Sequence, residues 1–188
     1  MKKGIKILLV SDGWVNLALG MIGPIYAIFV EEIGGDILDA SWAFSTYMFT
    51  AGIIMYLLSK WEDKAKHKEK FVVAGYALTS LGCLMYFFVH NQATLLLTQA
   101  VLGLSVAILS PSFDAIYSHY VKASEEASNW GIWEALSYIA TAIAAIIGGY
   151  IANSFGFKTL FVVMFIVSLF GTIQSFALYR GKKYLNAE

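Results

Sequence analysis

Residues 40–89 read ASWAFSTYMFTAGIIMYLLS, KWEDKAKHKEK and FVVAGYALTSLGCLMYFFV in succession, and this stretch decides the fold. Its two apolar runs hold 20 and 19 residues. A helix needs about 20 apolar residues to cross the hydrocarbon core of a bilayer, so each run is predicted to span a membrane. Between them lie five lysines that must stay in water: Lys60, Lys64, Lys66, Lys68 and Lys70. The stretch therefore predicts a helical hairpin across a membrane, with a basic loop on one side.

Apolar runs of similar length lie on both sides of this hairpin. The six predicted spans are about Ile5–Val30, Ala40–Ser59, Phe71–Val89, Thr94–Tyr120, Trp130–Asn153 and Thr159–Tyr179. Hydrophobic residues make up 59% of the chain and charged residues 14%, whereas soluble domains have about 45–50% and about 25%. We predict an all-α membrane protein in which residues 1–188 form one six-helix domain. Its formal net charge is zero, which does not support nucleic-acid binding.

The cationic residues are distributed unevenly between the two sides of the predicted bundle. If the N-terminus is cytoplasmic, 12 of the 13 lysines and arginines lie on that side, and Lys158 lies on the other. Cytoplasmic loops of membrane proteins carry such an excess. We therefore expect a multi-pass protein of the plasma (inner) membrane with both termini cytoplasmic.

The two prolines of the chain lie at corresponding places in two spans. Pro24 and Pro111 fall about two thirds of the way along the first and fourth spans, which cross the membrane in opposite directions. Paired helix breaks of this kind are typical of transporters built from inverted repeats. We predict two inverted three-helix repeats, about 1–90 and about 91–188, with helix breaks at Pro24 and Pro111.

Polar residues recur at helical spacing along the first, fourth and fifth spans. Unsatisfied polar groups in hydrocarbon cost several kcal/mol each, so these faces are expected to point at protein or water. They form the predicted substrate or proton-coupling cavity: Asp12, Asn16, Gln99, Ser110, Asp114, Glu134 and Tyr138.

Three carboxylic acids lie within the predicted spans. Asp12, Asp114 and Glu134 fall in the cytoplasmic third, where a carboxylate costs up to about 2.5–3.5 kcal/mol. Because burial favours the protonated acid, they are candidate proton carriers. The alternative is that each acid only fixes helix packing through hydrogen bonds. We expect no metal, since Asp114 and His119 would point about 140° apart on a helix, and no other cofactor.

Several short segments resemble motifs of the major facilitator superfamily. Residues 59–68, SKWEDKAKHK, resemble its G-x-x-x-D-R-x-G-R-R signature through Asp63, Lys64 and Lys68, with Ser59 and Lys66 in place of the glycines. Gln99 and Gly103 are similar to its R-x-x-x-G element, with glutamine in place of arginine. Residues 140–149 resemble its G-x-x-x-G-P-x-x-G-G element without the proline, and residues 156–161 resemble its entry into the sixth helix.

The resemblance implies a secondary active transporter that works by alternating access. Family members have twelve helices in two parallel halves, so a six-helix chain resembles a half-transporter. Two parallel copies would then enclose a cavity lined by the first and fourth spans, with Asp63, Lys64 and Lys68 gating its cytoplasmic side. The expected partners are a second copy, membrane lipids and a small polar or amphipathic cationic solute. Proton coupling through the embedded acids stays open.

Two alternatives to a homodimeric transporter remain. The chain could be a subunit that does not transport or that pairs with a different half-size partner. It could also be a six-helix excerpt of a twelve-helix transporter, since its basic ending, residues 180–183, would suit a central linker. An intramembrane enzyme is not expected, because the sequence has no G-x-G-D element, no HExxH and no serine elbow.

Overall fold

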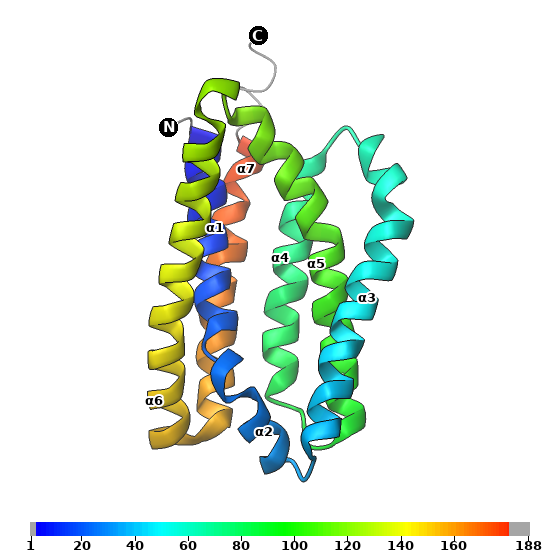
Figure 1. Cartoon of the computed structure of the whole chain (residues 1–188), viewed down its shortest axis with the longest axis vertical. Helices are drawn as coiled ribbons and strands as arrows, with labels where there is room; N and C mark the ends of the chain where they lie inside the picture. Colours follow the sequence, from blue (N-terminus) through cyan, green and yellow to red (C-terminus); the bar gives the residue numbers. More distant parts are fainter. Residues whose placement is uncertain (1–2, 181–188) are drawn as a thin grey trace.

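The computed structural model describes the backbone of residues 3–180 and the side chains of residues 4–179. These residues form a bundle of long helices (Figure 1). In chain order the elements are α1 (Lys3–Gly20), η1 (Gly23–Ile25), α2 (Tyr26–Glu32), α3 (Ile37–Asp63), α4 (Lys68–Tyr86), α5 (Gln92–Tyr120), η2 (Ala123–Glu125), α6 (Glu126–Ser175) and α7 (Ala177–Arg180). Of the cationic residues expected on the cytoplasmic side, Lys2, Lys182 and Lys183 lie outside the described residues.

Among the described residues, four stretches are long and apolar enough to cross a membrane: Gly4–Glu32, Ile37–Asp63, Gln92–Tyr120 and Ala123–Tyr179. The prediction of an all-α protein with helices of membrane-crossing length is thereby confirmed. The last stretch is interrupted at Gly156, whose φ of 81° and ψ of 165° are not helical. Figure 1 shows that α6 turns back at its lower end, so that its arms 126–155 and 157–175 run in opposite directions.

The two prolines have different effects on their helices. α1 ends at Gly20, and Pro24 lies in the short 3₁₀ helix η1 before α2 begins. In contrast, α5 continues through Pro111 as one helix from Gln92 to Tyr120. A proline removes one backbone hydrogen bond, and a membrane helix tolerates this where neighbouring groups compensate. The structure thus has a break at Pro24 but none at Pro111, where we predicted one.

The helices pack in two groups that meet along α4. α1 packs against α6, while α3 and α4 pack against α5, and α4 also contacts α6. Glycines allow the close approaches between them. A Cβ atom on Gly148 would collide with the carbonyl oxygen of Met21, and one on Gly103 would collide with that of Tyr47. Small residues have this role at helix contacts in membranes.

The helix starts at the end of the bundle away from the termini are fixed by local signals. α3 begins at a capping box formed by Asp36 and Asp39, and α5 begins at one formed by Asn91 and Thr94. Each box satisfies two backbone N–H groups that the helix itself leaves without a partner. Because these caps fix where α3 and α5 begin, they also fix the depth of the polar residues along both helices.

Candidate functional site

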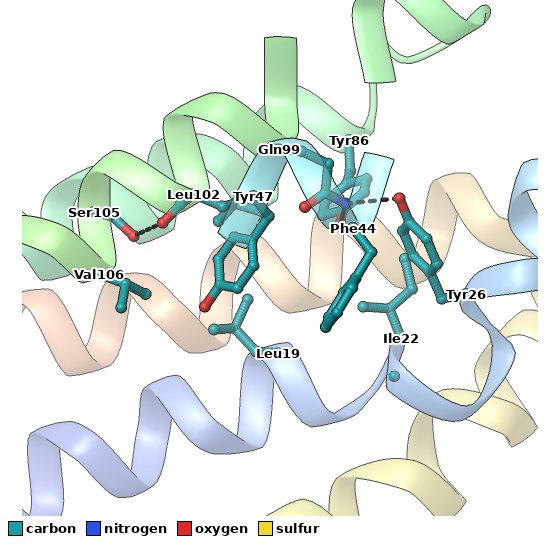
Figure 2. Close-up of a pocket in the computed structure, with 11 residues that line it drawn as sticks. Leu19, Ile22, Tyr26, Phe44, Tyr47, Tyr86, Gln99, Leu102, Ser105 and Val106 are labelled. Carbon is teal, nitrogen blue, oxygen red and sulfur yellow. Dashed lines mark hydrogen bonds between the residues drawn. The ribbon is translucent and has the colours of Figure 1, made fainter. Parts of the chain in front are cut away.

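A cavity of about 290 Å³ lies between the two helix groups, with α1, η1 and α2 on one side and α3, α4 and α5 on the other. Four aromatic side chains line it, together with the Gln99 amide and the Ser105 hydroxyl (Figure 2). We call this space the aromatic cavity. The aromatic residues are Tyr26, Phe44, Tyr47 and Tyr86.

Gln99 is the polar centre of the aromatic cavity. It is buried, and its amide nitrogen donates hydrogen bonds to the hydroxyl oxygens of Tyr26 at 2.8 Å and Tyr86 at 2.9 Å. Both amide hydrogens are used in this way, and the amide oxygen points away from Tyr26 (Figure 2). That oxygen can accept a hydrogen bond from a molecule in the cavity.

The remaining walls suit a solute that is partly apolar. Apart from its polar groups, the aromatic cavity is lined by aliphatic side chains such as Leu19, Leu102 and Val106. Aromatic faces attract cations and stack on flat rings. The arrangement can therefore hold an amphipathic molecule whose N–H group binds the Gln99 oxygen.

A second polar cluster lies around Asp12, nearer the start of α1, and joins α1, α4 and α6. Asp12 Oδ2 accepts hydrogen bonds from Trp133 Nε1 at 2.8 Å, from Asn16 Nδ2 at 2.9 Å and from Ser137 Oγ at 3.5 Å. Its Oδ1 accepts one from the Tyr76 hydroxyl at 3.4 Å. We call these five residues the Asp12 cluster.

The four side chains that donate hydrogen bonds to Asp12 are all neutral. A carboxyl group held by neutral donors can exchange a proton without breaking an ion pair. The same bonds also tie three helices together, with Tyr76 fully buried and Asp12 half-buried. The geometry is thus compatible with both roles considered for this acid, proton carriage and helix packing.

The other predicted cavity residues lie outside the aromatic cavity and the Asp12 cluster. Asp114 and Glu134 are exposed on α5 and α6, Tyr138 is 72% exposed, and Ser110 is half-buried. Within one chain the structure therefore brings together Asp12 with Asn16, and it places Gln99 with aromatic partners. The exposed carboxylates of Asp114 and Glu134 must face water or another protein surface, because a carboxylate in contact with lipid acyl chains costs several kcal/mol of free energy.

The predicted gate loop connects α3 to α4. Asp63 and Lys64 are exposed, whereas Lys68 is half-buried and donates from Nζ to the backbone oxygen of Glu62 at 3.0 Å. Glu62, which sequence reasoning missed, is 2% exposed, and its Oε2 accepts a hydrogen bond from Ser112 Oγ at 3.1 Å. Ser112 lies on α5, directly after Pro111, so this bond ties the end of α3 to α5.

Sequence reasoning also missed two tyrosines of these sites. Tyr76 and Tyr86 lie on α4, and both are buried. A usable signal was their spacing, since tyrosines ten residues apart lie about 80° from each other on a helix, on the same side. Among the described residues, no group of three His, Cys, Asp or Glu side chains could hold a metal ion.

Comparison with known proteins identifies relatives along nearly the whole chain. The sequence pattern of the Major Facilitator Superfamily matches residues 15–187. The Uncharacterized MFS-type transporter MJ1560 of Methanocaldococcus jannaschii is 21% identical over 94% of this chain and 45% of its own length. The Multidrug resistance protein MdtG of Yersinia enterocolitica is 23% identical over 90% of this chain and 42% of its own.

A third relative matches over a similar region. The Quinolone resistance protein NorA of Staphylococcus aureus is 22% identical over 81% of this chain and 39% of its own length. The chain thus spans less than half the length of these curated relatives.

Proposed function

The chain belongs to the major facilitator superfamily, and we propose that it is a half-size secondary transporter of small amphipathic cationic solutes, active as a parallel homodimer. The family consists of transporters, so the chain is a multi-pass membrane protein of a transport family and not an enzyme. The aromatic cavity with Gln99 at its centre is the observation that carries the proposal.

Six membrane crossings account for the arrangement of the helices. α1 with α2, α3, α4, α5 and the two arms of α6 give six, and an even number leaves both ends of the chain on one side. The start of α1 and the end of α7 do lie at the same end of the bundle (Figure 1). The lysine distribution favours the cytoplasm for that side. Two inverted repeats of three helices belong to this proposal.

Exposed surfaces on two helix groups favour a second subunit. Only 11% of the most apolar window of α3 is buried, against 39–44% for the three other candidate spans. Asp114 and Glu134 are exposed on membrane-crossing helices, where a partner or an enclosed aqueous space would relieve their cost. A second copy must be parallel, because the lysine asymmetry opposes insertion in both orientations.

The substrate class follows from the walls of the aromatic cavity. A cavity of about 290 Å³ lies at the lower end of ligand sites, which hold roughly 300–1,000 Å³, and pairing of two subunits would enlarge it. Tyr26, Tyr47 and Tyr86 offer aromatic faces to a cation, and Gln99 offers an acceptor. Relatives named for multidrug and quinolone resistance agree with a substrate that is aromatic and amphipathic.

Two further roles complete the proposed cycle. Asp12, held by neutral donors, carries the coupling proton, and Asp114 and Glu134 line the path by which it enters from the cytoplasm. Asp63, Lys64 and Lys68 form the cytoplasmic gate, which the bond between Glu62 and Ser112 links to α5.

Uptake by reconstituted protein tests the proposal. Purified protein in liposomes is given ethidium, a flat aromatic cation, with and without an imposed proton gradient. The proposal expects protein-dependent ethidium flux that Tyr47→Ala reduces and that the control Tyr56→Ala, at an exposed tyrosine of the same helix, preserves. Equal flux for both variants, or no flux under any gradient, would contradict it. Absence of flux together with capture of a different half-size partner would favour a hetero-pairing subunit.

A further inference from the structure

A second, larger groove lies on the side of α1 that faces away from the aromatic cavity. It has a volume of about 610 Å³ and runs between α1 and the first arm of α6. Val10 lines it, whereas Asp12, two residues further on, belongs to the Asp12 cluster. Two residues turn a helix by about 200°, so the groove and the cluster lie on opposite sides of α1.

The groove exists because small residues form its floor. Gly13 has no atom within 4 Å of the place where a Cβ would lie, and Ala140 faces it from α6. Apolar side chains such as Leu17, Leu136 and Ile143 form its walls. Apart from Lys6 and the indole N–H of Trp14, the lining side chains offer no hydrogen bond to a polar solute, so the occupant is apolar along most of its length.

One end of the groove carries a positive charge. Lys6 is exposed and is the one charged residue among those that line the groove. The nearest acid along α6, Glu134, lies two residues before Leu136 and so points to the other side of that helix. The groove is therefore apolar over its length and cationic at the end where α1 begins.

The length of the groove matches one leaflet of a bilayer. From Lys6 to Leu17 the α1 helix rises about 16 Å, at about 1.5 Å per residue. Half of the hydrocarbon core is about 15 Å thick. A lipid of the leaflet on the Lys6 side can thus lay a chain along the groove and keep its headgroup at Lys6.

We propose that this groove binds an anionic phospholipid, with one acyl chain against Gly13 and Ala140 and the phosphate at Lys6. Charge complementarity at Lys6 favours an anionic lipid over a neutral one of the same length, because lysines near a membrane surface attract anionic headgroups. The site depends on neither the proposed substrate nor the proposed homodimer.

Native mass spectrometry of the delipidated full-length protein tests the site. The protein is titrated separately with phosphatidylglycerol and with phosphatidylcholine of identical acyl chains. The wild type should retain phosphatidylglycerol with about fivefold preference, the ratio expected from one lysine. Lys6→Gln should remove the preference but keep binding of both lipids, while Gly13→Leu should lose both by filling the groove.

Matched controls separate the groove from the rest of the surface. Lys60→Gln removes an exposed lysine at the end of α3, and Gly52→Leu adds a side chain where nothing lies within 4 Å. Both should bind as the wild type does, with circular dichroism confirming unchanged helix content in every variant. Equal binding of the two lipids by the wild type, or lipid retained by Gly13→Leu, would overturn the proposal. It would also be overturned if Gly13→Leu separated a dimer and left lipid binding unchanged, since a second copy would then occupy the groove.

Discussion

The indole nitrogen of Trp133 donates a hydrogen bond of 2.8 Å to the Asp12 carboxylate, joining α6 to α1 across 121 positions of sequence. Asn16 and Tyr76 bind the same carboxylate from α1 and α4. The embedded acid that the sequence singled out is thus the meeting point of three helices. It is held by groups that cannot neutralise it, which is the arrangement expected of a proton carrier as well as of a packing residue.

Asp12→Asn separates these two roles. The amide keeps an oxygen that can accept from Trp133 but cannot exchange a proton, so we expect gradient-driven ethidium uptake to be lost. The free energy of unfolding should fall by about 1 kcal/mol, because hydrogen bonds to a charged group are stronger than neutral ones by about that amount. Uptake and thermal unfolding in the same detergent measure the two effects. Full gradient-driven uptake by the variant would show that Asp12 serves packing alone.

Tyr47→Leu tests the aromatic cavity. The substitution removes an aromatic face from the wall while keeping an apolar side chain, and Tyr47 forms no hydrogen bond to Gln99 that would be broken. Loss of one cation–π contact of about 0.5–2 kcal/mol should weaken ethidium binding by roughly 2- to 30-fold. Fluorescence titration gives the affinity. The matched control Tyr56→Leu, at a tyrosine of α3 that is 82% exposed, should bind as the wild type does.

Gly148→Ala and Gly149→Ala form a matched pair that tests the packing of α1 on α6. A Cβ on Gly148 would collide with the Met21 carbonyl oxygen, whereas one on Gly149 meets nothing within 4 Å. Overpacking of this kind costs about 1–3 kcal/mol, so Gly148→Ala should lower the unfolding temperature. Gly149→Ala should leave it unchanged or raise it, since alanine favours helices over glycine by up to about 1 kcal/mol. Equal unfolding temperatures would show that α1 and α6 are not this close.

Ser112→Ala tests the contact between α3 and α5. Ser112 donates to the buried Glu62 carboxylate, and a buried acceptor that loses its donor costs about 1–3 kcal/mol. The variant should therefore unfold at lower temperature than the wild type. Ser118→Ala, at an exposed position of the same helix, is the control and should unfold as the wild type does.

The all-α fold class and the approximate helix boundaries could be predicted, because a membrane-crossing helix requires length and apolarity, which are local properties of the chain. The pairing of Asp12 with Asn16 was also predictable, since residues four apart lie on one face of a helix. The sequence did not predict which neighbouring helices these faces contact. Periodicity shows which residues share a side of α4, but not that Tyr76 and Tyr86 of that side meet α1 and α5.

Two other features were hidden for different physical reasons. Glu62 lies in a run of charges that is normally solvated, and its burial depends on α5 passing beside the end of α3. Pro111 resembles Pro24 in sequence position, but the helix around it stays intact because the packing of α3 and α4 on α5 holds the chain in place. Both outcomes are decided by tertiary contacts that the local sequence does not contain.

The most direct test of a homodimeric transporter is ethidium uptake measured against the number of protein copies per liposome. Liposomes that hold at most one copy should show no uptake, and uptake should appear once two copies share a liposome. Uptake by single copies would contradict the homodimer, and no uptake at any density would contradict transport by this chain.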